Sequence, residues 1–230
     1  MALRLYDFPA SPFCIKVRSI LDYKGLVYER VDASRPSVMA ELKRRGGIGK
    51  VPALDIDGEL VCDSTDIAYA LERTAPTPQI VPDDPRQRGL CHVLEDWADE
   101  SLYWHGVYFR WWDSEGRAGA PAIFPKGFFG QRVIPRVVEH TARKQLMGQG
   151  TGRKSPQHVS RDLDRQLDHL QALLRDGPFL LGEAPMLCDF AVNGQLVYLD
   201  RTPHGRSALD SRPAIGTFMG RMRGFRRSGK

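Results

Sequence analysis

A proline-rich stretch, APTPQIVPDDP (75–85), divides the chain into two parts of different character. Four prolines within it disfavour both a regular helix and a paired strand, so the stretch predicts a linker. Short apolar runs of strand length occur before it, whereas helical periodicity dominates after it. The chain of 230 residues is therefore expected to form two domains, residues 1–76 and 86–230, joined by a linker at 77–85.

The first part shows the order of elements of a small α/β domain. The run LRLYDF (3–8) predicts a strand, and Ser11 followed by Pro12 predicts the start of a helix. Two apolar runs joined by Asp-Gly at 57–58 predict a hairpin. The remaining patterns predict a strand at 27–31, a helix at 36–45, hairpin strands at 51–56 and 59–63, and a helix at 64–74.

The second part is predicted to be all-helical. Apolar periodicity places helices at about 86–112, 129–147, 158–175 and 189–200. Two glycine-rich segments do not predict nucleotide sites. In GGIGK (46–50) the lysine is followed by valine rather than Ser or Thr, and GQGTG (148–152) follows a helix rather than a strand.

Composition predicts a soluble globular protein, with 42% apolar and 27% charged residues. The net charge of +5 is a mild excess, much of it in the last segment, GRMRGFRRSGK (220–230), which predicts a solvated terminus and no nucleic-acid partner. No stretch approaches the ~18 apolar residues of a membrane span. The first residues lack the pattern of a secretory leader, so a cytoplasmic location is expected.

The four cysteines are scattered among apolar residues, and no two have C-x-x-C spacing. Such a distribution predicts free thiols in a reducing compartment rather than a zinc site or a disulfide framework. No metal site is expected.

The segment KVPALDIDGELVCDS (50–64) carries the most specific chemistry. Proline within a strand favours a sheet edge or a bend. A cis Val51–Pro52 bond would free the backbone groups of Val51 to pair with an extended peptide. Asp63 and Ser64 at a helix N-terminus would hold an ammonium and a carboxylate. On spacing alone, a zwitterionic peptide site and an edge proline beside an ordinary helix cap remain equally open.

The motifs SPFCIKVR, GKVPAL and DST, with the linker and the helical second part, resemble the glutathione S-transferase superfamily. The resemblance implies a thioredoxin-like N-terminal domain, an all-α C-terminal domain and a homodimer. It implies glutathione bound by the Val51 backbone before cis-Pro52, with its γ-glutamyl end at Ser64 and Asp63. Lys50 is a candidate for the glycyl carboxylate or, alternatively, an ordinary solvated lysine.

Ser11 occupies the place where family members donate a hydrogen bond to the glutathione sulfur. Such a donor stabilises the thiolate, which is the reactive nucleophile. A plain N-cap is the alternative, and the two functions are compatible because capping uses the oxygen as acceptor. Cys14 lies one turn into the helix, where the dipole favours reactivity. Its shared face with Val17 and Leu21 favours packing, and a secondary thiol or the primary nucleophile are the alternatives for Cys14.

Three aromatic residues of the helix beginning near residue 86, Trp104, Tyr108 and Trp111, share one face. They are candidates for an apolar substrate pocket, and core packing is the alternative. The segments EDWADESLYWHGVYFRW (95–111) and RKQLMGQGTGRKSP (143–156) resemble the metaxin-like and failed-axon-connections branch of the superfamily, which includes members with a plausible non-enzymatic function.

The function predicted from the resemblance is conjugation of the glutathione thiolate to an apolar electrophile, as in detoxification. Two alternatives remain. One is a non-catalytic adaptor that binds glutathione or an apolar ligand. The other is a thiol–disulfide exchanger that uses Cys14.

Overall fold

The computed structural model describes residues 1–124 and 129–225. Its first part holds a four-stranded sheet with strand order β2-β1-β3-β4, in which β1 pairs parallel with β2 and antiparallel with β3. The elements are β1 (Leu3–Asp7), α1 (Pro12–Tyr23), β2 (Glu29–Asp32), α2 (Pro36–Arg44), β3 (Ala53–Ile56), β4 (Glu59–Cys62) and α3 (Ser64–Thr74). The predicted thioredoxin-like α/β architecture is confirmed.

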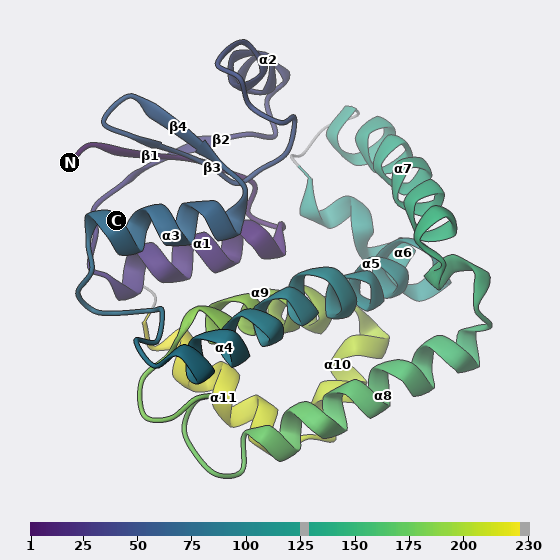
Figure 1. Cartoon of the computed structure of the whole chain (residues 1–230). Helices are drawn as coiled ribbons and strands as arrows, with labels where there is room; N and C mark the ends of the chain where they lie inside the picture. Colours follow the sequence, from purple (N-terminus) through teal and green to yellow (C-terminus); the bar gives the residue numbers. More distant parts are fainter. Residues whose placement is uncertain (125–128, 226–230) are drawn as a thin grey trace.

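Alternation along the strands gives the sheet two covered faces. Leu5 and Leu54 belong to the main core that α1 and α3 complete, whereas Tyr6 and Ala53 pack with Leu42 of α2 on the other side. In Figure 1, α1 and α3 accordingly lie between the sheet and the helical part, and α2 lies beyond the sheet.

The predicted hairpin is confirmed at Asp57 and Gly58, which both have positive φ, 52° and 98°. Two left-handed residues in a two-residue loop match the twist of the flanking strands, and glycine adopts this conformation without steric cost. The register pairs Ala53 with Cys62, so β3 begins after Pro52 rather than at Val51. The Val51–Pro52 bond is cis, as the segment suggested.

The second part is mostly helical, as expected, and among the described residues its strand-like pairing is limited to an isolated bridge between Phe179 and Gly182. Its elements are α4 (Pro85–Trp97), the π-helical turn η1 (Ala98–Leu102), α5 (Tyr103–Trp111), α6 (Ser114–Gly119), the 3-10 turn η2 (Ala120–Ile123), the π-helical turn η3 (Phe129–Val133), α7 (Ile134–Gln149), the 3-10 turn η4 (Thr151–Arg153), α8 (Pro156–Leu173), α9 (Leu187–Asp200), α10 (Pro203–Asp210) and α11 (Pro213–Arg223). The predicted helix at 86–112 is one helical run that a π turn interrupts. Three helices, α6, α10 and α11, were not predicted. Residues 226–230 of the basic terminus lie outside the described residues.

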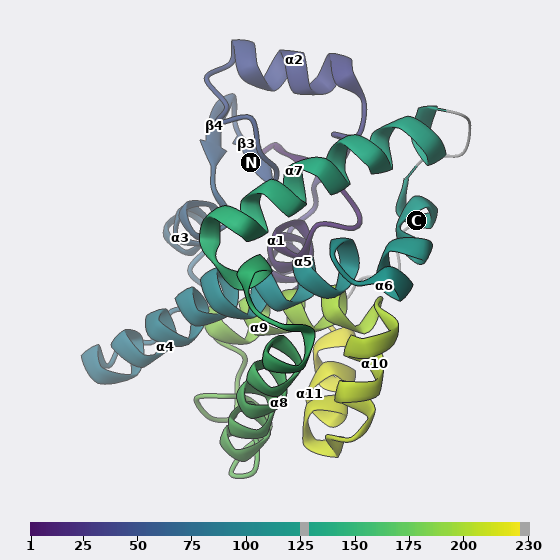
Figure 2. The ribbon, with the colours of Figure 1, turned by 90° about the vertical axis from the view of Figure 1, so that its right-hand side faces the viewer.

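Helix α9 is the centre of the molecule, since nearly all of its residues are buried. It packs against α1 of the first part and against α4, α5, α10 and α11 of the second. Figure 2 shows α2 at one end of the molecule and α8, α10 and α11 at the other, with α9 between them. The two parts therefore share a continuous apolar interface along α1 and α9.

The linker is anchored to both parts. The buried ammonium of Lys24 donates to Glu72 and to the carbonyls of Ala75 and Pro78, each at 2.7 Å. The backbone N–H of Leu187 donates to the Ile80 carbonyl at 2.7 Å. These bonds fix the start of α9 against the linker. In the chain segments described, no helix combines the length and the apolar content needed to cross a membrane.

Candidate functional site

A cavity of about 430 Å³ lies where the two parts meet, and we call it the aromatic cavity. The first part contributes Ser11, Lys50 and Val51 to its wall. The second part contributes aromatic side chains of α5 and α9, namely Tyr103, Trp104, Trp111 and Tyr198. Five residues that sequence analysis singled out, Ser11, Lys50, Val51, Trp104 and Trp111, thus line one cavity.

Ser11 is the N-cap of α1, with extended backbone at φ −70° and ψ 126°. Its Oγ accepts a hydrogen bond from the Cys14 backbone N–H at 3.3 Å, and Pro12 occupies the first helical position. Capping uses a lone pair and leaves the hydroxyl proton available. Cys14 Sγ lies within hydrogen-bond reach of the Ser11 hydroxyl, and a group in the aromatic cavity would be an alternative acceptor for that proton.

Cys14 is fully buried, with an exposed fraction of 0%. Its Sγ accepts a weak hydrogen bond from the Phe8 backbone N–H at 3.4 Å. Burial raises the pKa of the Cys14 thiol to about 12. The thiol is therefore protonated at neutral pH, and its environment is that of a packing residue.

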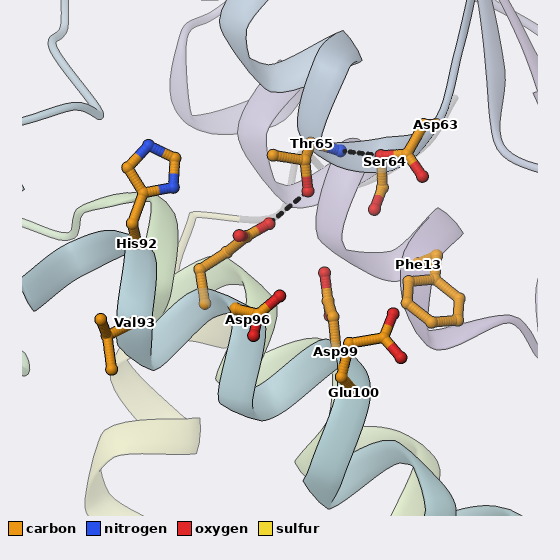
Figure 3. A pocket seen from close by; sticks show the side chains of 10 residues that line it. Phe13, Asp63, Ser64, Thr65, His92, Val93, Asp96, Asp99 and Glu100 are labelled. Carbon is orange, nitrogen blue, oxygen red and sulfur yellow. Dashed lines mark hydrogen bonds between the residues drawn. The ribbon is translucent and has the colours of Figure 1, made fainter. Parts of the chain in front are cut away.

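A second cavity of about 570 Å³ adjoins the first, and we call it the acidic cavity. The start of α3 contributes Asp63, Ser64 and Thr65, and α4 with η1 contributes mostly acidic side chains (Figure 3). Phe13, Asp99 and Glu100 line both cavities. The two predicted γ-glutamyl residues, Ser64 and Asp63, therefore face a space next to the aromatic cavity.

The turn before α3 determines the backbone conformation of Asp63 and the hydrogen bond of its carboxylate. Asp63 has a left-handed backbone, with φ 77°, and its Oδ1 accepts from the Thr65 N–H at 2.8 Å. The exposed carboxylate thus caps α3 with one oxygen. Its second oxygen remains available to a cation in the acidic cavity.

Beneath this cavity lies a fully buried ammonium, that of Lys16 in α1. Its Nζ donates to Asp99 Oδ2 at 2.7 Å, to Thr65 Oγ1 at 3.1 Å and to Ser64 Oγ at 3.4 Å, and it contacts Glu95. The Thr65 hydroxyl in turn donates to Glu95, as Figure 3 shows. Lys16 therefore joins the start of α3 to the acidic side chains of α4 and η1.

The charges of this cluster do not cancel. Burial alone would lower the pKa of Lys16, but Asp99 and Glu95 outweigh burial and raise it. One ammonium cannot compensate two buried carboxylates, and burial raises the pKa of Asp99. Burial, together with Asp96 and Asp99, likewise raises the pKa of Glu100. The acidic cavity is therefore suited to a cationic group such as an ammonium.

Three of the predicted site residues line neither cavity, and one of them is the fully buried Cys14. Pro52 follows Val51 and is buried. Tyr108 is buried in the core, where its ring stacks on Trp112 with centroids 6.1 Å apart. Trp104 and Trp111 therefore line the aromatic cavity, whereas Tyr108 has the core position that sequence analysis gave as the alternative.

Sequence reasoning missed Lys16 and Tyr198. Lys16 shares a helical face with Phe13 and the buried Ile20, and a cation on an apolar face is a recognisable signal. Nothing in the sequence near Tyr198 distinguishes that residue from other core aromatics. Across the part of the chain that the structure describes, no cluster of three or more His, Cys, Asp or Glu side chains has a geometry that holds a metal ion.

Two protein-family models match the chain. "Glutathione S-transferase, N-terminal domain" matches residues 5–79, and "Glutathione S-transferase, C-terminal domain" matches residues 156–221, so together they span more than half of the chain. The chain belongs to the glutathione S-transferase superfamily.

Individual relatives agree with this assignment. The isoprene-epoxide–glutathione S-transferase of Rhodococcus sp. (strain AD45) is 26% identical over 223 residues, which are 93% of this chain and 91% of that enzyme. The failed axon connections protein of Drosophila melanogaster is 26% identical over 212 residues, 83% of this chain but 47% of that protein. The crystal structure of glutathione transferase GSTFuA3 from Phanerochaete chrysosporium superposes with a TM-score of 0.76 at 18% identity, over 100% of this chain and 99% of that chain. That structural likeness supports the fold.

Proposed function

We propose that this protein is a glutathione transferase that joins the thiolate of glutathione to an apolar electrophile. The observation that carries the proposal is the position of Ser11 at the aromatic cavity, with a hydroxyl proton that capping does not use, between predicted peptide-binding groups and an aromatic wall. The relatives that use glutathione support the choice of thiol.

In the proposed pose, each end of glutathione lies next to protein groups of complementary charge or hydrogen-bonding capacity. The acidic cavity, with Asp63 and the hydroxyl of Ser64, receives the γ-glutamyl end. The backbone of Val51 pairs with the extended peptide, and Lys50 meets the glycyl carboxylate. The sulfur then lies at Ser11 in the aromatic cavity.

The proposed chemistry needs few protein groups. Ser11 donates a hydrogen bond to the sulfur, which favours the thiolate over the thiol and so lowers the pKa of bound glutathione. Trp104 and Trp111 hold the apolar electrophile against the sulfur, and the gain comes from positioning together with thiolate stabilisation. The Cys14 thiol takes no part.

The test is the variant Ser11→Ala, assayed for conjugation and for glutathione binding. A hydrogen bond to a charged group contributes about 1.5–3 kcal/mol, so kcat/KM should fall roughly tenfold to hundredfold while glutathione still binds. Ser155→Ala is a matched control because Ser155 also caps a helix, by accepting from His158 N–H at 3.2 Å before Pro156 at the first helical position. Unchanged conjugation by Ser11→Ala would refute the function assigned to Ser11.

The second candidate is a non-catalytic adaptor, which the match to the failed axon connections protein over 83% of this chain favours. An adaptor would bind glutathione or an apolar ligand and turn over no electrophile in a broad panel. Membership of the metaxin-like branch is proposed with this second candidate. A homodimer, a cytoplasmic location and the domain limits 1–76 and 86–230 are proposed with the transferase. Sedimentation at several protein concentrations tests the homodimer.

A further inference from the structure

Two buried cysteines from distant parts of the sequence meet where α4 packs against the start of α9. Cys91 of α4 is 2% exposed, and Cys188, the second residue of α9, is 0% exposed. The backbone N–H of Cys188 donates to Cys91 Sγ at 3.4 Å, and the two thiols lie within hydrogen-bond reach of each other. They form a dithiol that lines neither cavity, although 97 positions separate them in the chain.

The two thiols are not equivalent. The hydrogen bonds from Cys188 lower the pKa of the Cys91 thiol, although burial acts in the opposite direction. The contact with Cys91, together with burial, raises the pKa of Cys188 well above its usual range. A helix N-terminus also favours a nearby negative charge, and Cys91 Sγ accepts a backbone N–H from the first turn of α9. The first proton to leave the pair is therefore that of Cys91, which becomes the thiolate.

A carboxylate that can take the second proton lies beside Cys188. The Cys188 thiol donates to Asp189 Oδ2, with a distance of 3.8 Å between sulfur and oxygen. Asp189 is fully buried, and its two oxygens accept from the backbone N–H groups of Leu180 and Met186 at 2.9 and 2.8 Å. Burial raises the pKa of Asp189 to about 6, so this carboxylate is a stronger base than an ordinary aspartate. Cys188 therefore has a proton acceptor within reach.

The first turns of α4 give a small molecule access to Cys91. Residues 85–90, which precede Cys91 in this helix, are all exposed, so Cys91 is the first buried residue of α4. In Figure 2 this end of α4 extends away from the neighbouring helices. A helix end with few buried contacts opens at a low free-energy cost. Such opening brings the Cys91 sulfur into contact with solvent without unfolding of the core.

We propose that Cys91 and Cys188 are a redox modification site, at which a hydroperoxide joins them in a disulfide that ties α4 to the start of α9. The site lies outside both cavities, so the inference goes beyond the proposed transferase function and does not depend on it.

The proposed reaction has two steps. The Cys91 thiolate attacks one peroxide oxygen, the S–O bond forms, and the O–O bond breaks with its electron pair on the second oxygen, which takes a proton from solvent. Cys188 then gives its proton to Asp189 and attacks the Cys91 sulfur. The S–S bond forms, and the S–O bond breaks to release hydroxide, which takes that proton and leaves as water. The two sulfurs lose two electrons in total, and the hydroperoxide is reduced to an alcohol and water.

The test treats the native, reduced protein with hydrogen peroxide, removes the peroxide with catalase, and alkylates the remaining thiols with N-ethylmaleimide in denaturant. Mass spectrometry of a digest without reductant should find the peptides of Cys91 and Cys188 linked, with the loss of two hydrogen atoms, and dithiothreitol should separate them. Recovery of both cysteines as N-ethylmaleimide adducts would overturn the inference.

Cys14 is the matched control within the same chain. It is likewise buried, and its Sγ also accepts a backbone N–H at 3.4 Å, from Phe8. Its hydrogen-bonding partners, Phe8 and Ser11, supply no second thiol. Cys14 should therefore be recovered as the N-ethylmaleimide adduct after the same treatment. Oxidation of Cys14 as fast as that of the Cys91–Cys188 pair would show that the pair has no special reactivity and would overturn the inference.

Two variants test which sulfur attacks the peroxide. Cys188→Ala keeps Cys91 but removes its partner, so peroxide should leave a sulfenic acid on Cys91 that dimedone labels. Cys91→Ala should give far less dimedone adduct on Cys188. Equal labelling of the remaining cysteine in both variants would overturn the assignment of Cys91 as the nucleophile. The linked-peptide measurement needs no variant, so it still decides the inference if either variant fails to fold.

Thermal unfolding of the wild type tests the structural effect of the disulfide. The bond closes a loop that spans 97 positions and so constrains the unfolded chain. The peroxide-treated, linked protein should therefore unfold at a higher temperature than the reduced protein, and dithiothreitol should return the midpoint to its starting value. An unchanged or lower midpoint in the linked protein would overturn the claim that the disulfide ties α4 to α9.

Discussion

The two adjoining cavities are built from different interactions, although Phe13, Asp99 and Glu100 belong to both. The acidic cavity rests on a buried cluster in which Lys16 is shared by Asp99, Glu95 and two hydroxyls. The aromatic cavity rests on rings and has few charged groups. A ligand with a zwitterionic end and a reactive apolar partner would match this division.

The difference between the cavities has an energetic consequence. A buried charge depends on its partners, and removal of one partner leaves another charge uncompensated. An aromatic wall loses buried apolar area and contacts when one ring is truncated, but no buried charge loses its partner. Substitutions in the acidic cavity should therefore damage stability and polar recognition, whereas those in the aromatic cavity should mainly damage binding of the electrophile.

The largest effect on stability is expected for Lys16→Met, which leaves the buried carboxylates of Asp99 and Glu95 without their cation. Loss of one member of a buried ion pair costs about 3–5 kcal/mol, so the free energy of unfolding in urea should fall by that amount. The triple variant that adds Glu95→Gln and Asp99→Asn removes the stranded charges and should recover most of the loss. A single-variant cost below about 1 kcal/mol would mean that the cluster is solvated and not a buried network.

Ser64→Ala should produce the second-largest effect, and that effect should be confined to the binding of glutathione. The variant removes a hydroxyl at the start of α3 that lines the acidic cavity. Loss of one hydrogen bond to a charged group, at about 1.5–3 kcal/mol, should raise the KM for glutathione by tenfold or more while the KM for the electrophile stays nearly constant. A rise in the KM for the electrophile instead would place the γ-glutamyl end elsewhere.

Trp104→Ala should show the opposite pattern. Truncation of a partly buried ring of the aromatic cavity removes apolar contact with the electrophile. We expect the KM for an apolar electrophile to rise severalfold and the KM for glutathione to remain unchanged. Steady-state kinetics with each substrate varied in turn separates the two. If both constants shift equally, Trp104 supports the whole interface and not the electrophile.

The smallest effect is expected from thiol modification. At about pH 8, near the ordinary pKa of a thiol, iodoacetamide should label the partly exposed Cys62 before Cys14. Activity should change little, because Cys62 lies in β4 and lines neither cavity. Mass spectrometry of the native protein locates the label. Preferential labelling of Cys14 would instead support the hypothesis of a thiol–disulfide exchanger.

Local patterns were sufficient for the elements whose residues specify them locally. Asp57–Gly58 specified the hairpin, and the apolar runs on either side of it specified β3 and β4. Ser11–Pro12 specified the start of α1. Short helices were missed, because α10 and α11 are separated only by Ser211 and Arg212 and follow α9 with little interruption. Their independent existence depends on packing against α9.

The part of the site that was missed depends on contacts between distant residues. The environment of Lys16 is set by side chains 79 and 83 positions away, on α4 and η1. That of Tyr198 is set by Trp111, 87 positions away, and by the missing side chain of Gly106. No local periodicity carries such information. The motifs at Ser11 and 50–64 could be recognised in the sequence because each combines a turn residue with a helix start.

The central claim is that Ser11 activates the thiol of bound glutathione, and the pKa of that thiol tests it most directly. Ultraviolet absorbance of the thiolate, titrated with pH in the protein–glutathione complex, gives the value. We predict a pKa well below the ordinary ~8.5 of a free thiol in the wild type, and a rise of about one unit or more in Ser11→Ala, which corresponds to loss of ~1.4 kcal/mol or more. The same pKa in both proteins, with glutathione bound, would contradict the account.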